Sequence, residues 1–161
     1  MEALNQKIAE AIEALGVAHE RMTIDPAYAD TAAFCEQYGY PPEKSGNTII
    51  VASKKEPKQY VACVVLAPTQ LDVNRRVRKL MGVSRASFAT ADEMMELTGM
   101  EVGGVTPFAL PEGLPLYVDE RIMALDWVIL GGGGRDTKIK IAPDVFTKLG
   151  AEVISDLGIE R

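Results

Sequence analysis

The sequence is poor in the residues that most often build metal and nucleophile sites. It has one histidine, His19, and two cysteines, Cys35 and Cys63, among 161 residues. Without CxxC or HxxxH spacing we predict no zinc site, and a single histidine excludes a His–His acid/base pair. No Ser-His-Asp or Cys-His set is apparent. We expect both cysteines to be buried, reduced thiols, and His19 to be a partly exposed strand residue.

Long hydrophobic runs are also missing. No run approaches the roughly 18 apolar residues that span a membrane, and the N-terminal stretch MEALNQKIAEAIEAL carries acids where a secretion signal is basic. We therefore expect a cytoplasmic protein without a membrane partner. The length, with no linker, repeat or low-complexity segment, predicts a single domain over residues 1–161.

The charge balance is unfavourable for a protein that coats nucleic acid. The net charge is −6, and we predict no DNA partner. Residues 72–85 nevertheless carry five basic side chains against one acid: Arg75, Arg76, Arg78, Lys79 and Arg85. The basic residues of a helix over 73–81 cannot all share one face, which favours a solvated face over a contact with a tRNA stem.

Hydrophobic spacing, caps and stops predict five helices, over residues 2–15, 31–38 (capped by Asp30), 73–81, 91–98 and 144–149. Strands are expected over 17–24, 48–52, 59–67, 116–118, 127–130 and 137–142, with a hairpin joining the second and third. The segment 102–110 is extended but interrupted by glycine and proline. Because these elements show no regular βαβ alternation, we expect a mixed α/β domain around one sheet.

The run Gly131-Gly132-Gly133-Gly134 invites comparison with phosphate-binding loops. It lacks GxGxxG spacing and a GK[ST] ending, and it joins two strand-like runs instead of opening a helix. A hairpin turn is the preferred interpretation. The basic residues that follow, Arg135, Lys138 and Lys140, are candidate ligands for a backbone phosphate.

A second glycine segment, Gly103-Gly104-Val105-Thr106-Pro107, combines free backbone N–H groups with a hydroxyl and a stiffening proline. Such a loop is able to direct donors at a carbonyl oxygen, as ester cleavage requires. Composition alone favours a plain structural turn.

Four strings in order change that balance: GNTIIV near residue 46, APTQLDVNRRVRKLMG, GGVTPF and GGGGRDTKIKIAPDVF. Together they resemble the YbaK/prolyl-tRNA synthetase-associated domain family, over about residues 20–150. Each string alone is weak, but four in register are specific.

The resemblance implies a mixed α/β fold with a curved central sheet and surrounding helices. It implies hydrolysis of the ester between a small mischarged amino acid and the terminal ribose of tRNA, assisted by a substrate hydroxyl, with no metal or organic cofactor. The expected partners are the aminoacyl-tRNA acceptor end and an aminoacyl-tRNA synthetase. Residues 103–107 would hold the aminoacyl group, and Gly131, Gly132, Gly133 and Arg135 would lie beside the same pocket.

One position departs from the family pattern. Where most members have lysine in a K-T-[LI]-[LVI] string, this chain has Asn47, which is uncharged. Our hypothesis has the amides of residues 103–106 binding the aminoacyl carbonyl or amine, Asn47 the terminal adenosine, and Arg135 and Lys138 the acceptor-end phosphates. Two alternatives remain: a weak or inactive module that binds tRNA, a nucleotide or a synthetase, and a hydrolase for a small ester unrelated to tRNA.

Overall fold

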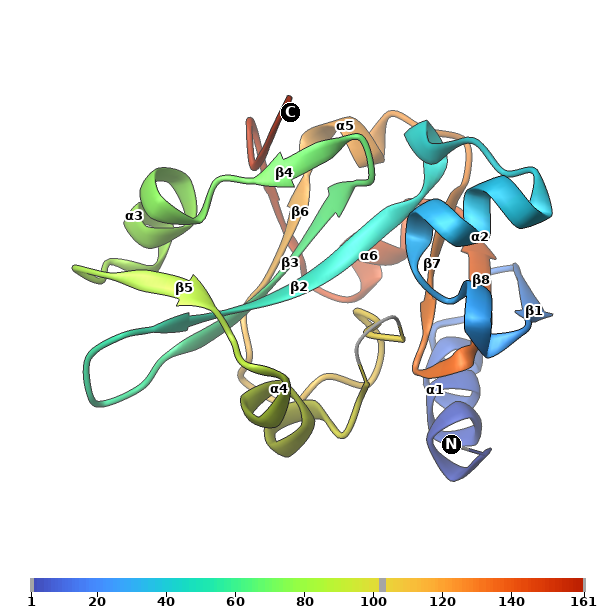
Figure 1. Ribbon diagram of the computed structural model, residues 1–161, viewed down its shortest axis with the longest axis horizontal. Helices are drawn as coiled ribbons and strands as arrows, with labels where there is room; N and C mark the ends of the chain where they lie inside the picture. Colours follow the sequence, from blue (N-terminus) through green and yellow to red (C-terminus); the bar gives the residue numbers. More distant parts are fainter. Residues whose placement is uncertain (1, 102–103, 161) are drawn as a thin grey trace.

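The computed structural model describes residues 2–101 and 104–160, and it has a mixed α/β fold built on a five-stranded sheet (Figure 1). The strand order is β5-β2-β3-β6-β9. β2 pairs antiparallel with β3 and β5, while β3–β6 and β6–β9 are parallel pairs. The strands are β2 (Gly46–Ser53), β3 (Tyr60–Leu66), β5 (Ala86–Phe88), β6 (Leu116–Asp119) and β9 (Glu152–Ile154). The predicted hairpin of β2 and β3 is thereby confirmed.

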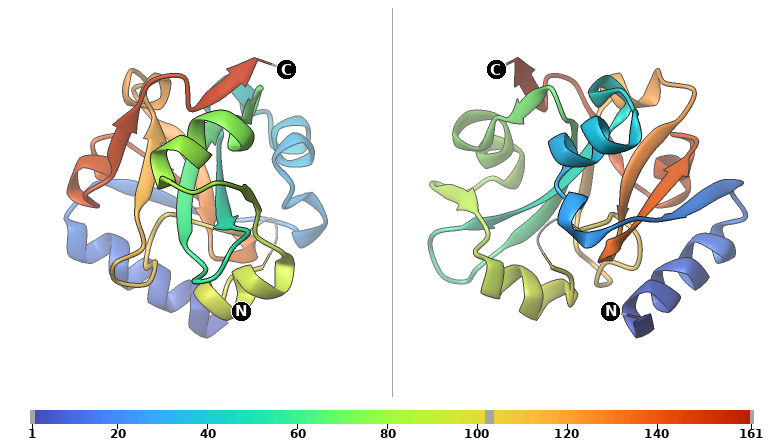
Figure 2. Two further views of the ribbon diagram at one scale, coloured as in Figure 1. Left: turned by 90° about the vertical axis from the view of Figure 1, so that its left-hand side faces the viewer. Right: turned by 45° about the vertical axis from the view of Figure 1, so that its right-hand side comes forward.

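The expectation of one sheet is wrong, because three further strands form a separate antiparallel sheet in the order β1-β8-β7. These are β1 (His19–Thr23), β7 (Val128–Gly132) and β8 (Gly134–Ile141). Ser45, which immediately precedes β2, forms an isolated parallel bridge with Ile129 of β7. The two sheets therefore touch at one corner and diverge from it (Figure 2). A short pair, β4 (Thr69–Leu71) with β10 (Gly158–Glu160), completes the strands of the described residues.

The predicted helices form close to their expected bounds, as α1 (Glu2–Leu15), α2 (Thr31–Tyr38), α3 (Arg78–Met81), α4 (Ala91–Thr98) and α6 (Val145–Lys148). The helix α5 (Glu120–Met123) and the single turns η1 (Pro26–Tyr28) and η2 (Pro42–Lys44) were not predicted. A reciprocal capping box between Thr90 and Glu93 begins α4, and a left-handed Gly99 ends it. The expected helix over 73–81 begins as a π-helical turn, η3 (Val73–Val77), before α3.

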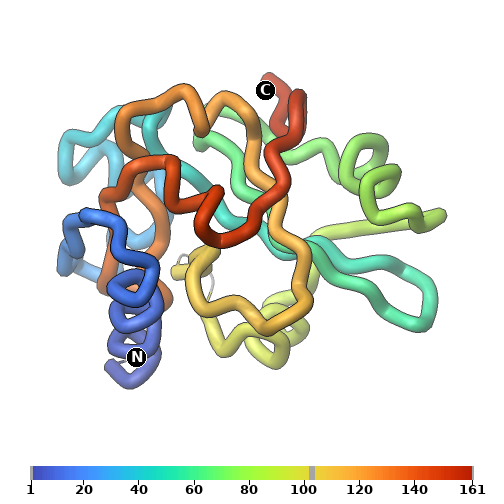
Figure 3. The backbone as a smooth tube through the Cα atoms, turned by 180° about the vertical axis from the view of Figure 1, so that it is seen from behind, coloured from blue at the N-terminus to red at the C-terminus, as the bar shows by residue number. Residues whose placement is uncertain are grey.

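Two hydrophobic cores lie on opposite faces of the five-stranded sheet. Side chains alternate between faces along a strand, so Ile50, Ala62 and Val64 join the larger core, which also holds residues of α1, α4, β7 and β8. Val51 and Cys63 face the smaller core, beneath η3. Seen from behind, the C-terminal segment crosses the back of the molecule (Figure 3). Within the described part of the chain, no helix has the length and apolar character of a membrane span.

Candidate functional site

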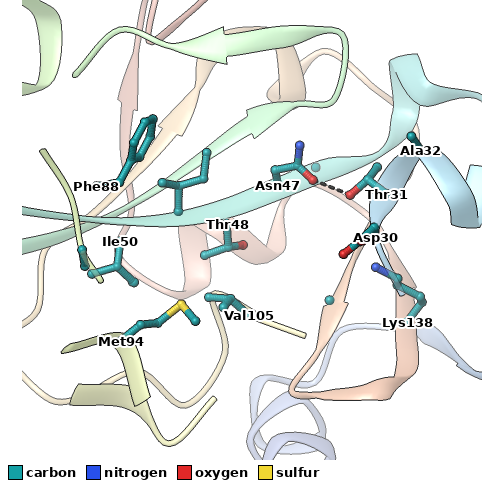
Figure 4. A pocket seen from close by; sticks show the side chains of 14 residues that line it. Asp30, Thr31, Ala32, Asn47, Thr48, Ile50, Phe88, Met94, Val105 and Lys138 are labelled. Carbon is teal, nitrogen blue, oxygen red and sulfur yellow. Dashed lines mark hydrogen bonds between the residues drawn. The ribbon is translucent and has the colours of Figure 1, made fainter. Parts of the chain in front are cut away.

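A cavity of about 430 Å³ opens where the two sheets diverge (Figure 4). β2 forms one wall, the start of α2 and β8 the second, and α4 with the loop around Val105 closes the third. Its lining residues are Asp30, Thr31, Ala32, Gly46, Asn47, Thr48, Ile49, Ile50, Phe88, Ala89, Met94, Val105, Gly131 and Lys138.

The edge of β2 supplies main-chain polar groups to this cavity. The carbonyl of Ile50 accepts from the Ala89 N–H at 2.9 Å, whereas Ser53 N–H donates to Gln59 on the other side of the strand. Because N–H and C=O groups of alternate residues point to the same edge, those of Thr48 face the cavity side with those of Ile50. Pairing with β5 begins at Val51, and the bridge to β7 lies at Ser45. Thr48 therefore occupies the gap between two pairings, where its main chain faces the cavity.

The side chain of Thr48 adds a second polar group. Its Oγ1 is buried and has no hydrogen-bond partner within the described residues. Leaving a buried hydroxyl unsatisfied costs about 1–3 kcal/mol, so such groups are rare and call for an explanation. A substrate oxygen in the cavity would supply the missing partner.

Asn47, predicted from the family pattern, does line the cavity. Its Oδ1 accepts a 2.5 Å hydrogen bond from Thr31 Oγ1 at the start of α2, and its nitrogen points away from Thr31 (Figure 4). Neighbouring residues of a strand face opposite sides, so Asn47 and Thr48 project on opposite faces of β2. The amide of Asn47 is thus oriented for donation at the cavity mouth.

Lys138 places a positive charge in the opposite wall. Only 5% of the residue is exposed. Its Nζ donates to the Ala29 carbonyl at 2.7 Å and lies 5.4 Å from the centre of the Phe34 ring. Burial lowers the pKa of Lys138 to about 8, against opposing effects of Cys35 and Asp30. A buried ammonium is unfavourable unless it has partners, which makes this lysine a candidate for function.

Asp30 was predicted to cap α2, and it occupies the N-cap position, but its side chain makes no capping hydrogen bond. Its carboxylate instead lines the cavity and lies 3.8 Å from the Arg135 guanidinium. Arg135 also donates to the Pro26 carbonyl at 3.3 Å. Arg135 therefore contacts a residue of the cavity wall, although it is not among the described residues that line the cavity.

The glycines form a wall of closely packed backbone. A Cβ on Gly131 would lie 2.4 Å from the Val105 carbonyl oxygen, and one on Gly104 would lie 2.5 Å from that of Gly133. The Gly133 N–H donates to the Gly104 carbonyl at 2.8 Å. The two glycine segments identified in the sequence thus contact each other at distances that only glycine allows.

The predicted hairpin turn at the glycine run is confirmed, although the strands extend into it. β7 includes Gly131 and Gly132, β8 begins at Gly134, and Gly133 carries a φ of +104°. A Cβ on Gly132 would lie 2.5 Å from Thr137 Cγ2. The run is a tight hairpin, not the entry to a helix.

Among the predicted loop residues, Val105 lines the cavity, whereas Thr106 and Pro107 are not among the described residues that do so. Thr106 is fully buried, and its Oγ1 accepts from the Phe108 N–H at 3.4 Å. Pro107 lines a separate cavity beside Ala109 and Leu110. Gly103 lies outside the described residues.

Sequence reasoning missed Thr48, Thr31 and the orientation of Asp30. Thr48 was visible as the neighbour of Asn47, but no pattern shows that a hydroxyl will lack a partner.

The cysteines and the histidine do not line the cavity. Cys35 and Cys63 are buried free thiols, and burial raises the pKa of Cys63 to about 12. His19 is half-buried in β1 with Nδ1 2.9 Å from the Val17 carbonyl. No metal-binding group of His, Cys, Asp or Glu occurs in the described residues.

Comparison with known proteins bears on this cavity. The chain is 28% identical over 106 residues to the uncharacterized protein YwhH of Bacillus subtilis, which covers 63% of this chain and 66% of YwhH. It is 27% identical over 131 residues to a proline–tRNA ligase of Paraburkholderia phymatum, which covers 76% of this chain and 23% of the ligase. The chain thus spans under two thirds of each relative's length.

Two solved structures share the fold over nearly the whole chain. The hypothetical protein APE2540 has a TM-score of 0.85 and 28% identity, covering 95% of this chain and 99% of its own. A protein proposed to be a trans-editing enzyme for prolyl-tRNA synthetase has a TM-score of 0.82 and 22% identity, covering 96% and 97%. At 22% identity, the likeness to this second structure shows a shared fold and nothing more.

The family itself is identified by residues 25–149, which match the aminoacyl-tRNA editing domain. That span runs from η1 to the end of α6 and includes every residue of the cavity. The chain belongs to the aminoacyl-tRNA editing domain family.

Proposed function

We propose that this protein is an aminoacyl-tRNA deacylase that acts in trans on a small mischarged amino acid. The observation that supports this most directly is the buried hydroxyl of Thr48, which has no hydrogen-bond partner among residues 2–101 and 104–160 and faces a cavity with a buried ammonium in its opposite wall. Hydrolysis of an ester develops negative charge on the carbonyl oxygen, and preorganised donors stabilise that charge.

The cavity divides into an apolar and a polar part, and each fits one portion of the substrate. Ile50, Met94 and Val105 bound the apolar part, which would receive the amino-acid side chain. The Asp30 carboxylate would pair with the α-ammonium group. Asn47, at the mouth, would hydrogen-bond the terminal adenosine.

The reaction needs only water as a second reactant. Water attacks the ester carbonyl carbon, the C=O π electrons move to oxygen, and the C–O bond to the ribose then breaks. The ribose oxygen takes a proton, so the products are the free amino acid and deacylated tRNA. Thr48, through its hydroxyl and main-chain N–H, and the Lys138 ammonium would stabilise the oxyanion.

Lys138 is better suited to the carbonyl than to an acceptor-end phosphate. A residue that is only 5% exposed meets a group that enters the cavity, whereas the RNA backbone stays outside. Arg135, with its side chain 31% exposed, remains the candidate for a phosphate. The amides of residues 103–106 remain a prediction, because Gly103 lies outside the described residues.

The test is a deacylation panel with tRNA charged with Ala, Cys, Ser, Thr or Pro. We expect cleavage of at least one ester well above the uncatalysed rate, and slower cleavage of that ester by Thr48→Val. Wild-type protein that cleaves none of the five overturns the proposal.

A second candidate function is a binding module without catalysis, and the predicted departure from the family pattern favours it: the lining residue Asn47 is uncharged at the position expected to hold lysine. Such a module would bind acceptor-end RNA and release no amino acid. Release of amino acid from a charged tRNA by wild type, but not by Lys138→Met, excludes it. A hydrolase for small esters would instead cleave an aminoacyl ester equally well without RNA.

A further inference from the structure

Phe88 is an exposed aromatic side chain at the junction of two cavities. It lies at the end of β5, the edge strand, and is 58% exposed. It lines the candidate site and also a second cavity of about 350 Å³. In Figure 4 the ring stands on the face of β2 from which Asn47 projects. A chain that leaves the first cavity toward the second therefore passes over this ring.

The second cavity offers groups that suit a nucleobase. Its wall includes Gln70, Asn74 and Ser87, whose amides and hydroxyl both donate and accept hydrogen bonds, as base edges do. The ring of Phe88 supplies a stacking surface, which tolerates any base.

Positive charge lies beside this second cavity. Arg75 is 80% exposed, with Nε 3.9 Å from the carboxylate of Asp72 in the cavity wall. Arg78 Nε donates at 2.9 Å to the carbonyl of Asn74, another wall residue. The Arg78 guanidinium is thus anchored beside the cavity, the Arg75 guanidinium lies exposed next to it, and both are suited to phosphates.

The opposite flank of the candidate site is negatively charged. α4 presents the exposed acids Asp92 and Glu96, which repel phosphates. A polyanionic strand with its end in the first cavity is therefore directed toward η3 and α3 and away from α4. This gives the basic segment a role that the sequence alone did not favour.

We infer that the second cavity, with Phe88, Arg75 and Arg78, binds the single-stranded RNA immediately before the terminal adenosine. A base stacks on Phe88, and the adjoining phosphates meet the two arginines. This inference rests on the proposed function for the identity of the RNA, and it is tested by binding so that the two can fail separately.

The experiment measures binding of an uncharged, fluorescent single-stranded RNA ending in CCA by anisotropy. Phe88→Ala is expected to weaken binding roughly 5- to 100-fold, as loss of one stacked base does, and Phe88→Trp to preserve it. Val153→Ala is the matched control, because Val153 is 50% exposed on β9, the opposite edge of the same sheet. Wild type that does not bind, or Phe88→Ala that binds like Val153→Ala, overturns the inference.

The salt dependence separates stacking from charge. Arg75→Gln is expected to reduce the slope of log K against log salt by about 0.7, the value for one phosphate contact of a single strand. Phe88→Ala leaves the slope unchanged. Arg21→Gln, the same charge change on the exposed face of β1, is the control. Equal slopes for Arg75→Gln and Arg21→Gln would contradict a phosphate contact at Arg75.

Kinetics distinguish this inference from the proposed function. Phe88→Ala should raise KM for an aminoacyl-tRNA by a larger factor than KM for the matching aminoacyl-adenosine, because the latter has no preceding nucleotide. A wild type that binds RNA through Phe88 but cleaves no ester disproves the deacylase and leaves the RNA site standing. Cleavage of aminoacyl-tRNA by wild type, with no effect of Phe88→Ala on KM or on RNA binding, disproves the RNA site and leaves the deacylase standing.

Discussion

The two long walls of the candidate cavity are built in contrasting ways. The glycine wall, in which Gly131 lines the cavity and Gly104 belongs to the adjoining loop, is backbone against backbone, with a carbonyl oxygen close to where the Cβ of each would stand. The polar wall, formed by Thr48 and Asn47 on β2 facing Asp30 and Lys138, depends on side chains. The glycine wall fixes the shape of the site, and the polar wall supplies its charges and donors. Substitutions in the glycine wall should therefore reduce stability and activity together. Substitutions in the polar wall should reduce activity without a matching loss of stability.

The largest effect is expected from Gly131→Ala. The added Cβ would lie 2.4 Å from the Val105 carbonyl oxygen, so two backbone segments must separate. Overpacking of this kind commonly costs about 1–3 kcal/mol, and we expect that loss in the free energy of unfolding together with loss of deacylation. Chemical denaturation and the deacylation assay measure both.

Gly150→Ala is the matched control, because its φ is +75° and its Cβ would meet nothing within 4 Å. It should lose about 1 kcal/mol through backbone strain and keep its activity. If Gly131→Ala behaves like Gly150→Ala, the close contact between the glycine segments is not what shapes the site.

The second largest effect is expected from Lys138→Met, which should reduce activity while the protein still folds. Removing a donor to a developing oxyanion costs about 10²–10³ in kcat, and methionine retains the apolar stem against Phe34. We expect kcat to fall by that factor while the fold persists by circular dichroism. A fall in stability with an unchanged kcat in the folded fraction would make Lys138 purely structural.

The effects of Lys138 on stability and on rate should change with pH in opposite directions. The pKa of Lys138 is lowered from 10.5 to about 8, so between these values the unfolded chain holds a proton that the folded chain has lost. Stability then rises with pH in this window. Wild type should gain stability relative to Lys138→Met between pH 8 and 10.5, while its rate advantage over that variant shrinks above pH 8.

Thr48→Val should have a smaller effect on rate and an opposite effect on stability. Valine has the shape of threonine without the hydroxyl that lacks a partner in the described residues. We expect a loss of about 10-fold in kcat with a gain near 1 kcal/mol in the free energy of unfolding, since the desolvation penalty of an unsatisfied hydroxyl disappears. Thermal unfolding and single-turnover deacylation measure the two. Destabilisation by valine would show that the hydroxyl is already satisfied in the folded protein.

Asn47→Lys should change the rate least. Lys138 already supplies a buried charge to the cavity, and Asn47 lies on the other face of β2 from Thr48, so a second ammonium adds a contact at the mouth only. We expect a change within about 10-fold, the scale of a single contact of roughly 1.4 kcal/mol. A gain approaching 10³ would show that the native asparagine limits catalysis.

The sequence predicted features that depend on neighbours along the chain. The helices over 31–38 and 91–98 and the β2–β3 hairpin all come from local rules. The two glycine segments and Asn47 were identified from the order of family motifs. Val105, Asn47, Gly131 and Lys138 were all named as candidates, and the structure brings them to one cavity.

The remaining features arise from packing between distant segments. That Asp30 would face the cavity instead of capping α2 depends on β8, more than 100 residues away. The burial of Lys138 depends on α2 and its Phe34. The hydroxyl of Thr48 lies in a gap between two strand pairings, and the division into two sheets that creates this gap leaves no mark on the period of hydrophobic residues.

Single-turnover deacylation by wild type, Thr48→Val and Lys138→Met decides whether the polar wall hydrolyses an aminoacyl ester. With tRNA charged with the best of the five amino acids, we expect cleavage by wild type. We expect a loss of about 10-fold for Thr48→Val and of about 10²–10³ for Lys138→Met, both variants remaining folded. Equal rates for the three folded proteins would contradict a catalytic role of this wall.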